Sequence, residues 1–565
     1  MKKIHVTFLF VTIAFLANSQ NSSFVWAKKM DGSSGISPRS LSTDPMGNVY
    51  TTGFFSGTID FDPSDDVYNL TSSQDGTVEV YISKLDSIGN FAWAKSIGSI
   101  SDEIAYSIAS DSLGNVYVAG NFSLTVDFDP GIGINELTAE GIDAFILKLN
   151  TDGDFLWVKK LGGSSIDVPY YIALDRIGNI YTTGYFFGTA DFDPGATVGS
   201  LTSTGDADVF VSKLDSDGNF VWAKNFGGAA GEAGYGLAVD SAGNVYTSGL
   251  FQSDADFDPS AFNYNLSSLG FSDIFIQKLD AMGNFLWAKQ IGGNFIDYSF
   301  SLALDKQANV FTTGSFSDTV DFDPGIGTTF LTASQYGNSA FISKLDAAGN
   351  YVWAMKIGEV PTSNAEGYSI GIDASNNVYA CGVFSSIADF DPSSNVYNLT
   401  SFGYNDAFVT RLTNSGDLIE ALQFGGTLSD RSFGVKMDDT YNIYCTGDFG
   451  DTADFDPSNG VFNLISNGGA FVVKLGQSST GLFENMRSEI VAYPNPTNGF
   501  FNFNIEMPIK NKVLEVYNNM GELIFNQKVT NQFIAIDLST YSNGLYFLKV
   551  IQEGKQIESL KIVKQ

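Results

Sequence analysis

The chain has 565 residues, of which 30 are Lys or Arg and 63 are Asp or Glu, so its formal net charge at pH 7 is −33. An acidic surface of this kind repels nucleic-acid phosphates and anionic lipid, and it favours cations, among which Ca²⁺ is the obvious extracellular candidate. The only histidine is His5, so a His general base or a His-ligated metal is excluded once the leader described next is removed.

Residues 1–19 have the pattern of a secretory signal peptide. Two lysines precede an apolar run over residues 6–17, and small residues follow it, so we expect cleavage near Ser19 or Gln20. No later stretch approaches the roughly 18 to 20 apolar residues that a membrane helix needs, so no transmembrane span is predicted. No cysteine lies near the cleavage site, which argues against a lipid-anchored amino terminus.

One unit recurs between residues 20 and 476, and its clearest mark is the phrase Asp-Phe-Asp-Pro. The phrase begins at residues 60, 127, 191, 256, 321, 389 and 454, so successive copies lie 67, 64, 65, 65, 68 and 65 residues apart. Each unit contains short stretches rich in β-branched and aromatic residues between turn signals, which in the second unit are 107–110, 115–122, 143–149 and 155–163. Four antiparallel strands per unit, repeated several times, predict an all-β fold of the β-propeller class.

The strand count at the two ends of this region predicts how a ring would close. Tryptophans 26, 93, 157, 222, 287 and 353 share one place in the fourth strand, and Glu420 takes that place in the seventh. The first such strand precedes any complete unit, whereas the last unit ends after its third strand, 471–475. We therefore expect seven four-stranded blades, the last completed by the amino-terminal strand, because this pairing removes two exposed sheet edges. The tryptophans are expected to pack between blades rather than to form a sugar-binding platform.

Cys381 and Cys445 lie in the second strand of neighbouring units, at adjacent positions of the repeat. Side chains alternate between the two faces of a strand, so the two thiols should point in opposite directions. We expect buried free thiols rather than a disulfide.

Two hypotheses explain the Asp pairs of the repeated phrase. In the first, both carboxylates share a face of an extended segment and ligate Ca²⁺ together with backbone carbonyls and the acid that opens the third strand. That acid is Glu79, Asp143, Asp208, Asp273 or Asp406, and units five and seven have Ser339 and Gly469 there. In the second, the first Asp caps a turn and the second, held extended by the proline, fixes the exit from the second strand. The candidate ligands are Asp60, Asp62, Asp127, Asp129, Asp191, Asp193, Asp256, Asp258, Asp321, Asp323, Asp389, Asp391, Asp454 and Asp456.

A ten-residue phrase before and within the second strand also recurs. It reads DSLGNVYVAG at 111–120, DRIGNIYTTG at 175–184 and DSAGNVYTSG at 240–249, and pairs of glycines at 162–163 and 292–293 precede first strands. With these features the unit resembles the SBBP-type β-propeller repeat of bacterial surface proteins. The resemblance spans seven units and implies a surface or S-layer-like protein.

The periodicity ends after residue 475, residues 477–490 have the composition of a linker, and the strands that follow alternate in polarity. This alternation predicts a small antiparallel β-sandwich over 491–565. The motif residues are Tyr493, Pro494, Asn495, Pro496, Gly521, Gly544, Tyr546, Lys561 and Lys564. They resemble a type A sorting domain of the type IX secretion system, which implies export across the outer membrane of a Bacteroidota-type bacterium by that machinery. The mature protein would then be attached to the surface or released; the alternative is an ordinary sandwich that binds a partner.

Three functions stay open. The leading one is a non-enzymatic secreted or cell-surface protein, a binding or adhesion scaffold whose ligand is a glycan or a matrix protein. The second is an ion-stabilised structural protein resembling a surface layer, and the third is an extracellular polysaccharide hydrolase or lyase. Catalytic groups should depart from the repeat, and the departures, Glu420, Arg431 and Tyr441, cluster where the ring is expected to join.

Overall fold

The computed structural model describes residues 22–334, 337–358, 363–458 and 460–477 in the first part of the chain. In the last part it describes residues 491–493, 497, 499–504, 512–518, 522–528, 533–552 and 555–564. The regular elements of these residues are β-strands, and none of them is a helix that could cross a membrane. Contacts divide the chain into two compact units between Ser479 and Thr480. The predicted signal peptide lies outside the described residues.

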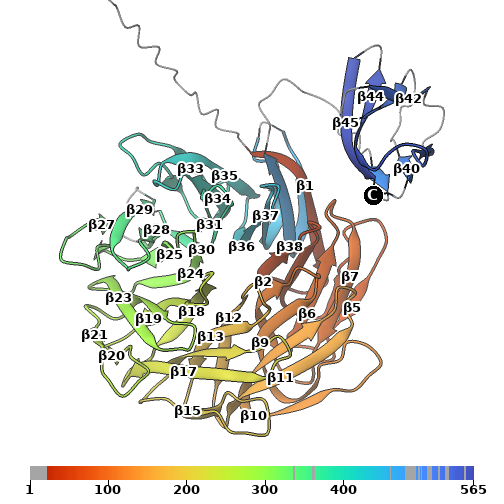
Figure 1. The fold of residues 1–565 in the computed structure, drawn as a ribbon. Coiled ribbons are helices and arrows are strands. Elements are labelled where there is room, and N and C mark those ends of the chain that lie inside the picture. The colour runs from red at the N-terminus through yellow and green to blue at the C-terminus, as the bar shows by residue number, and fades with distance from the viewer. Residues whose placement is uncertain are drawn as a thin grey trace, which may run out of the picture. The chain divides into compact units, whose positions relative to one another are not determined.

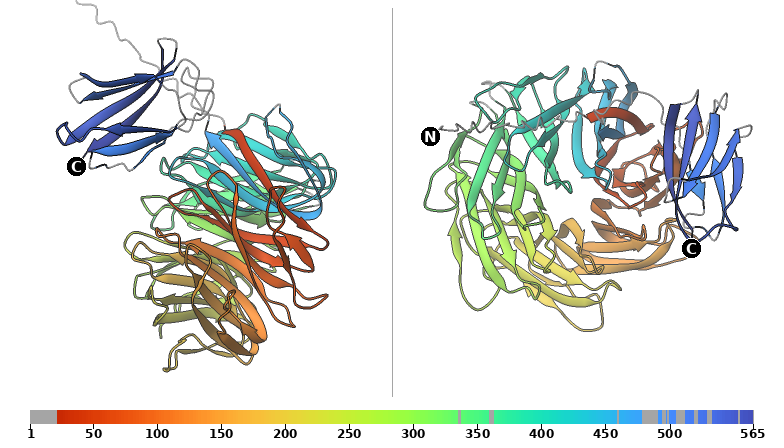
Figure 2. Two further views of the ribbon diagram at one scale, coloured as in Figure 1. Left: turned by 90° about the vertical axis from the view of Figure 1, so that its right-hand side faces the viewer. Right: turned by 45° about the horizontal axis from the view of Figure 1, so that its top comes forward.

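The first unit is a succession of antiparallel sheets arranged around its middle (Figures 1 and 2). The first sheet contains β2 (Ile36–Thr43), β3 (Val49–Phe55), β6 (Glu79–Leu85) and β7 (Phe91–Ile97), in that order. The same order recurs in β8 (Ile104–Ser110), β9 (Val116–Asp127), β10 (Glu136–Leu149) and β11 (Phe155–Gly163); in β12 (Asp167–Leu174), β13 (Ile180–Phe186), β16 (Asp208–Leu214) and β17 (Phe220–Gly228); in β18 (Ala233–Val239), β19 (Val245–Phe251), β22 (Asp273–Leu279) and β23 (Phe285–Gly293); in β24 (Tyr298–Leu304), β25 (Val310–Phe316), β28 (Ser339–Leu345) and β29 (Tyr351–Ile357); and in β30 (Ala365–Ile372), β31 (Val378–Phe384), β34 (Asp406–Leu412) and β35 (Leu418–Gly426). The predicted all-β, β-propeller-like class is confirmed.

The recurring Asp-x-x-Gly-Asn phrase forms the hairpin turn between the first two strands of a sheet. In the second sheet the Asp111 carboxylate accepts hydrogen bonds from the backbone amides of Leu113 and Asn115, at 2.9 Å each. Gly114 has φ +79°, a conformation that glycine adopts without strain. The turn chemistry therefore fixes the hairpin without a ligand.

A short hairpin encloses each Asp-Phe-Asp-Pro phrase, and the sequence did not predict it. Its strands are β4 (Thr58–Asp60) and β5 (Asn69–Thr71), β14 (Thr189–Asp191) and β15 (Ser200–Thr202), β20 (Asp254–Asp256) and β21 (Asn265–Ser267), β26 (Thr319–Asp321) and β27 (Phe330–Thr332), and β32 (Ile387–Asp389) and β33 (Asn398–Thr400), with the other two copies continuous with β9–β10 and β37–β38. In five of the seven units the hairpin pairs with the last strand of the preceding sheet, as Asp191 does with Gly162. It therefore links neighbouring sheets, and its three-residue strands are too short to leave a periodic pattern.

The two ends of the first unit share one sheet. That sheet contains β36 (Arg431–Met437), β37 (Ile443–Asp454), β38 (Asn463–Gln477) and β1 (Ser22–Gly32). β1 pairs antiparallel with β38, from Ser22 opposite Gln477 to Met30 opposite Ala470 (Figure 1). β2, the first strand of the first sheet, also contacts β36 and β37 of this last sheet. Strands from the start and the end of the unit are thus hydrogen-bonded neighbours.

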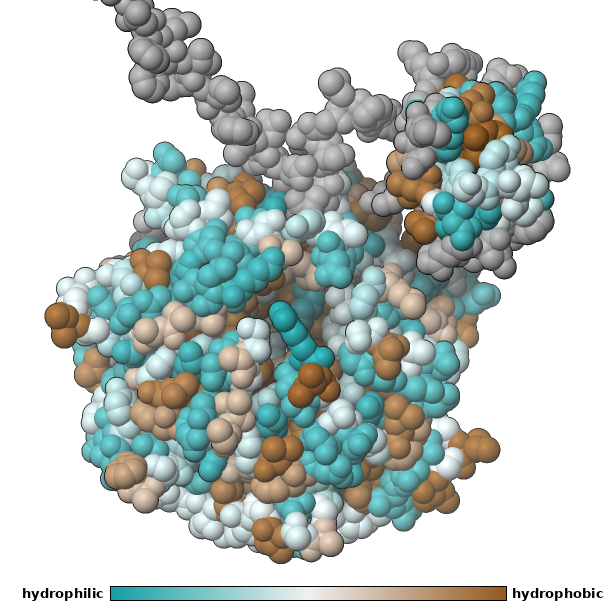
Figure 3. Space-filling model, in the orientation of Figure 1, coloured by the Kyte–Doolittle hydropathy of each residue, from teal (hydrophilic) through white to brown (hydrophobic). Residues whose placement is uncertain are grey.

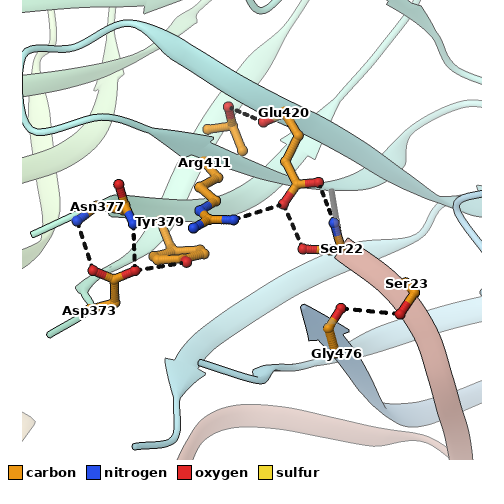
Figure 4. A network of polar contacts seen from close by, with 9 residues as sticks. Ser22, Ser23, Asp373, Asn377, Tyr379, Arg411, Glu420 and Gly476 are labelled. Carbon is orange, nitrogen blue, oxygen red and sulfur yellow. Dashed lines mark hydrogen bonds and ion pairs between the residues drawn. The ribbon is translucent and has the colours of Figure 1, made fainter. Parts of the chain in front are cut away.

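The contacts of Glu420 explain why this residue departs from the repeat. Its carboxylate accepts hydrogen bonds from the backbone amide of Ser22 at 2.8 Å and from the Ser22 hydroxyl at 2.6 Å. The Arg411 guanidinium lies 3.8 Å from the same carboxylate (Figure 4). The residue that replaces tryptophan in the sixth sheet therefore anchors the first described residue of β1.

The tryptophans pack between neighbouring sheets, as predicted. The Trp93 indole donates a hydrogen bond to the Thr151 carbonyl in the next sheet at 3.0 Å, and its ring lies 6.2 Å from that of Tyr50, centroid to centroid. A Cβ on Gly153, whose φ is +78°, would lie 2.9 Å from the Trp93 ring. Glycine at this turn therefore makes room for the tryptophan of the preceding sheet.

Cys381 and Cys445 are free and buried, which confirms the prediction. Burial raises the pKa of the Cys381 thiol to about 12. Both side chains nevertheless belong to one apolar cluster. The argument from strand faces missed this, because opposite faces of two successive sheets face each other across one interface.

The second unit contains two antiparallel sheets. One has β39 (Val491–Tyr493), β40 (Phe500–Asn504) and β43 (Phe533–Asp537), and the other has β42 (Leu523–Lys528), β41 (Lys512–Asn518), β44 (Gly544–Gln552) and β45 (Lys555–Lys564). Its buried core includes Leu514, Val516, Ile536 and Leu548. The arrangement is that of the predicted small sandwich.

Candidate functional site

One position of each first strand projects a large side chain into the middle of the first unit. These side chains are Arg39, Tyr106, Tyr170, Tyr235, Phe300, Tyr368 and Phe433, whose spacings are the same as those of the Asp-Phe-Asp-Pro phrases. At each of them the pairing of the first strand with the second shifts by one residue, which is a β-bulge. A bulge re-aims the side chain of the extra residue. We call these seven side chains the channel row.

The aromatic members of the channel row contact one another in sequence. Centroid distances between successive rings from Tyr106 to Phe433 lie between 4.8 and 5.8 Å. Arg39 continues the row, since its guanidinium carbon lies 5.7 Å from the ring centroid of Phe433. Six aromatic rings and one guanidinium therefore lie side by side.

The channel row lines a cavity of about 510 Å³, a volume typical of small-ligand sites. Its cationic lining residues are Arg39, Arg431 and Lys436, and no acidic side chain is among the described residues that line it. The rest of this region is strongly acidic, with 20 basic and 56 acidic residues outside the leader and residues 487–565. Figure 3 shows polar and apolar side chains interspersed in small groups over one face, without a broad apolar patch. The cavity thus differs in charge from the rest of the unit.

The two arginines of the cavity differ in their partners. Arg431 donates two hydrogen bonds to Asp448, at 3.0 and 2.6 Å, and these bonds raise the pKa of the guanidinium. Arg39 lies over the rings of Phe54 and Phe433, at 5.2 and 5.7 Å, and its Nε atom is buried without a hydrogen-bond partner in the described residues. Of the two arginines, only Arg431 has an ion-pair partner among the described residues.

The phenols of the channel row stay neutral. Burial raises the pKa of Tyr106 and of Tyr235 to about 12. Each can therefore donate a hydrogen bond from its hydroxyl and present an apolar ring face. A cation beside aromatic faces is a combination that suits an anionic ligand carrying an apolar ring surface.

Sequence reasoning missed the channel row. Alignment of the seven units could have revealed it, because an aromatic residue occupies this place of the first strand in every unit except the first, which has Arg39. Of the predicted departures, Arg431 lies in the cavity rather than only at the junction. Tyr441 takes the glycine place of the turn between β36 and β37, with φ +65°.

The Asp pairs of the repeated phrase make turn contacts. The Oδ1 atom of the first Asp accepts hydrogen bonds from the amide of the second Asp and from the amide eight residues on, as Asp321 does from Asp323 at 3.1 Å and Thr329 at 2.7 Å. The second Asp accepts from the amide two residues on, as Asp323 does from Gly325 at 2.8 Å. The phenylalanine between them is buried, as Phe322 is. Calcium binding by these pairs stays a prediction.

The acids that open the third strands lie against a second acid that the sequence argument did not consider. It stands 24 residues on, where the next sheet begins, and the pairs are Glu79 with Glu103, Asp143 with Asp167, Asp208 with Glu232, Asp273 with Asp297, and Asp406 with Asp430. All ten side chains are buried. Burial and the neighbouring carboxylate raise the pKa of Asp167 and of Asp297 to about 7. We call these the buried acid pairs.

The described sorting-motif residues lie in the second unit. Tyr546 is buried in its core, Gly544 begins β44 with φ +151°, and the Lys564 ammonium donates to the Ser539 carbonyl at 3.3 Å. Tyr493 belongs to β39 and Lys561 to β45, opposite Phe547. Pro494, Asn495, Pro496 and Gly521 lie outside the described residues.

Comparison with protein families identifies the domain in the last part of the chain. Residues 491–565 match the secretion system C-terminal sorting domain. Residues 92–121 and 156–185 match the SBBP β-propeller repeat. Both matches agree with the resemblances seen in the motifs. The sorting domain indicates export by the type IX secretion system to the cell surface or the extracellular space, and so an interaction with that machinery.

Individual relatives are more distant. The uncharacterized WD repeat-containing protein L264 of Acanthamoeba polyphaga mimivirus is 25% identical over 513 residues, which cover 76% of this chain and 36% of the relative. The chain thus spans about a third of that protein's length. The structure of Sqt1 from Chaetomium thermophilum aligns with a TM-score of 0.35 at 10% identity, over 81% of this chain and all of the other. PorZ of Porphyromonas gingivalis, described as a surface component of the type IX secretion system, aligns with a TM-score of 0.23 at 10% identity, over 94% and 81%.

Proposed function

We propose that this chain is a non-enzymatic binding protein of the cell surface or extracellular space, and that its central cavity holds a carboxylate-bearing glycan. The observation that carries the proposal is the cavity itself. Three cations and a row of aromatic rings line it, without an acidic side chain among its described lining residues, in one of the most acidic regions of the chain.

The framework of the proposal is a seven-bladed β-propeller closed by β1. The pairing of β1 with β38 and the contact of β2 with β36 and β37 support it. So does the presence of one bulged residue in each of seven first strands, with all seven lining one cavity. A closed ring would hold the seven side chains at fixed distances, which reduces the entropy that ligand binding costs.

The ligand class follows from the side chains. Aromatic rings pack against the apolar faces of sugar rings, and a guanidinium forms paired hydrogen bonds with a carboxylate. Arg39 has no ion-pair partner among the described residues, whereas Arg431 is held by Asp448. A uronic acid unit would place its carboxylate at Arg39 and its ring on the neighbouring aromatic side chains.

Binding without catalysis is supported by the departures from the repeat. The Glu420 carboxylate accepts a hydrogen bond from Ser22 and pairs with Arg411, and Arg431 pairs with Asp448. These side chains have structural partners, and a glycoside hydrolase of the common two-carboxylate kind would need acidic groups at the cavity. We therefore expect an acidic oligosaccharide to keep its length, as measured by chromatography, after incubation with the protein.

A glycan array followed by calorimetric titration tests the proposal. We expect binding to glycans that contain uronic acids, with Arg39→Gln lowering the affinity about tenfold or more, because a charge-assisted hydrogen bond contributes roughly 1.5 to 3 kcal/mol. Arg176→Gln is the matched control, since Arg176 lies exposed in a turn. Binding confined to neutral glycans, or an affinity that Arg39→Gln leaves unchanged, would contradict the proposal.

The buried acid pairs favour a second candidate, an ion-stabilised structural protein of the cell surface. Ordered lattices on isolated cells, together with no glycan binding, would support that candidate. The two proposals share the fold and differ in the role of the cavity.

A further inference from the structure

We propose that the buried acid pairs Asp273–Asp297 and Asp406–Asp430 each bind a divalent cation such as Ca²⁺ at the passage from one sheet to the next. The inference concerns groups other than the Asp-Phe-Asp-Pro pairs and does not rest on the cavity.

Each pair concentrates two carboxylates in one buried place. Asp273 and Asp297 are both fully buried, and a glycine is required beside them, because a Cβ on Gly292 would lie 2.3 Å from one Asp273 oxygen and 2.6 Å from the other. Gly425 stands in the same relation to Asp406. Two unneutralised carboxylates in such a place are strongly destabilised by desolvation and mutual repulsion.

In each of these two pairs one oxygen of the first acid lacks a hydrogen-bond partner, whereas both oxygens of the second acid accept from backbone amides. Asp273 Oδ2 accepts from the Leu269 amide at 3.0 Å and from the Gln290 side chain at 2.6 Å. Its Oδ1 atom is buried without a hydrogen-bond partner in the described residues, and so is Oδ1 of Asp406. Carboxylate oxygens of this kind are ligands that Ca²⁺ prefers, with carbonyl groups and water to complete its coordination.

In the second sheet, the buried acid pair has a cation from the chain itself. There the Lys160 ammonium lies 3.1 Å from Asp143 Oδ2. The corresponding residue is a neutral amide in three other pairs. Asn225 donates to Asp208, and Gln290 and Gln423 donate to Asp273 and Asp406, the acids of the two pairs proposed here. No lysine or arginine lies within 4.0 Å of those two pairs in the described residues. An external cation would do there what Lys160 does in the second sheet.

The two acids are also lost together. In the fifth unit the first place is taken by Ser339, whose hydroxyl accepts a hydrogen bond from the Ser334 amide at 3.2 Å. The second place is taken by Ala365, which pairs with Phe384 as Asp167 pairs with Phe186. In the seventh unit the places are taken by Gly469 and Ile36. No unit keeps one acid without the other, as expected if both act on one ion.

Calcium stoichiometry and melting temperature of the full secreted chain at pH 7.5 test the proposal. We expect the double variant Asp273→Asn, Asp297→Asn to bind one Ca²⁺ fewer than the wild type, and to show a smaller loss of melting temperature on adding a chelator. Asp321→Asn, Asp323→Asn is the matched control in the exposed hairpin of the next unit, and it should keep the wild-type stoichiometry.

The variant Gln290→Lys keeps the proposal falsifiable if the double variant does not fold. It places an ammonium where Lys160 stands in the second sheet, so we expect it to fold and to bind one Ca²⁺ fewer. The proposal is overturned if the wild type binds no calcium, if Gln290→Lys leaves the stoichiometry unchanged, or if only the exposed hairpin variant reduces it. If calcium does not change the melting temperature of the wild type and acidification raises it, the two acids of each pair share a proton. That result also overturns the proposal.

Discussion

At the scale of single residues, the repeated Asp-Phe-Asp-Pro phrase combines a turn with a core contact. The first Asp closes the turn through two backbone amides, and the phenylalanine fills the space between sheets. Phe322 lies 5.3 Å from Phe316 and 5.1 Å from Phe341, centroid to centroid. The phrase persists in a strand-rich chain because its acid acts in the turn and only its apolar residue enters the core.

Replacing that phenylalanine should therefore destabilise the fold. We expect Phe322→Ala to lower the free energy of unfolding by about 3 to 5 kcal/mol, because it removes a fully buried ring and leaves a cavity. Phe330→Ala, in the same hairpin, is the control, since Phe330 is 63% exposed and should change stability little. The measurement is urea unfolding followed by tryptophan fluorescence; equal effects of the two variants would refute the packing role.

At the scale of elements, the sequence predicted the repeated strands. It did not predict the bulges or the contacts between sheets, because the alternation of polar and apolar residues along a strand contains no information about either. The alternation and the turn residues predicted the hairpin of β8 and β9 and the place of the tryptophan strands. The bulges that aim the channel row have no signature of their own, because one extra residue in a strand changes the pairing and not the composition. The partners of the third-strand acids were missed because they lie in the next sheet, 24 residues on.

The junction strand β1 gives a prediction at this scale. We expect Glu420→Ala to lower stability by about 1.5 to 3 kcal/mol, because it removes hydrogen bonds from Ser22 to a charged group, and to increase hydrogen exchange in β1. Glu136→Ala, at an exposed position of the hairpin in β10, is the control. Unchanged exchange in β1 would mean that Glu420 does not hold this strand.

At the scale of the whole molecule, the repeat spacing and the terminal motifs were enough to predict a β-propeller-like unit followed by a sorting domain. The cavity could not be predicted, since it exists only where first strands from all parts of the unit meet. Its charge is a property of the assembled unit: Arg39 and Arg431 stand 392 positions apart in the sequence and line one space.

A crystal structure of the full secreted chain with a bound uronic-acid oligosaccharide tests the central claim most directly. The account predicts seven sheets, β1 hydrogen-bonded to β38, and a sugar carboxylate paired with the Arg39 guanidinium against the aromatic channel row. A sugar bound on the rim, or a different number of sheets with β1 lying elsewhere, would contradict it.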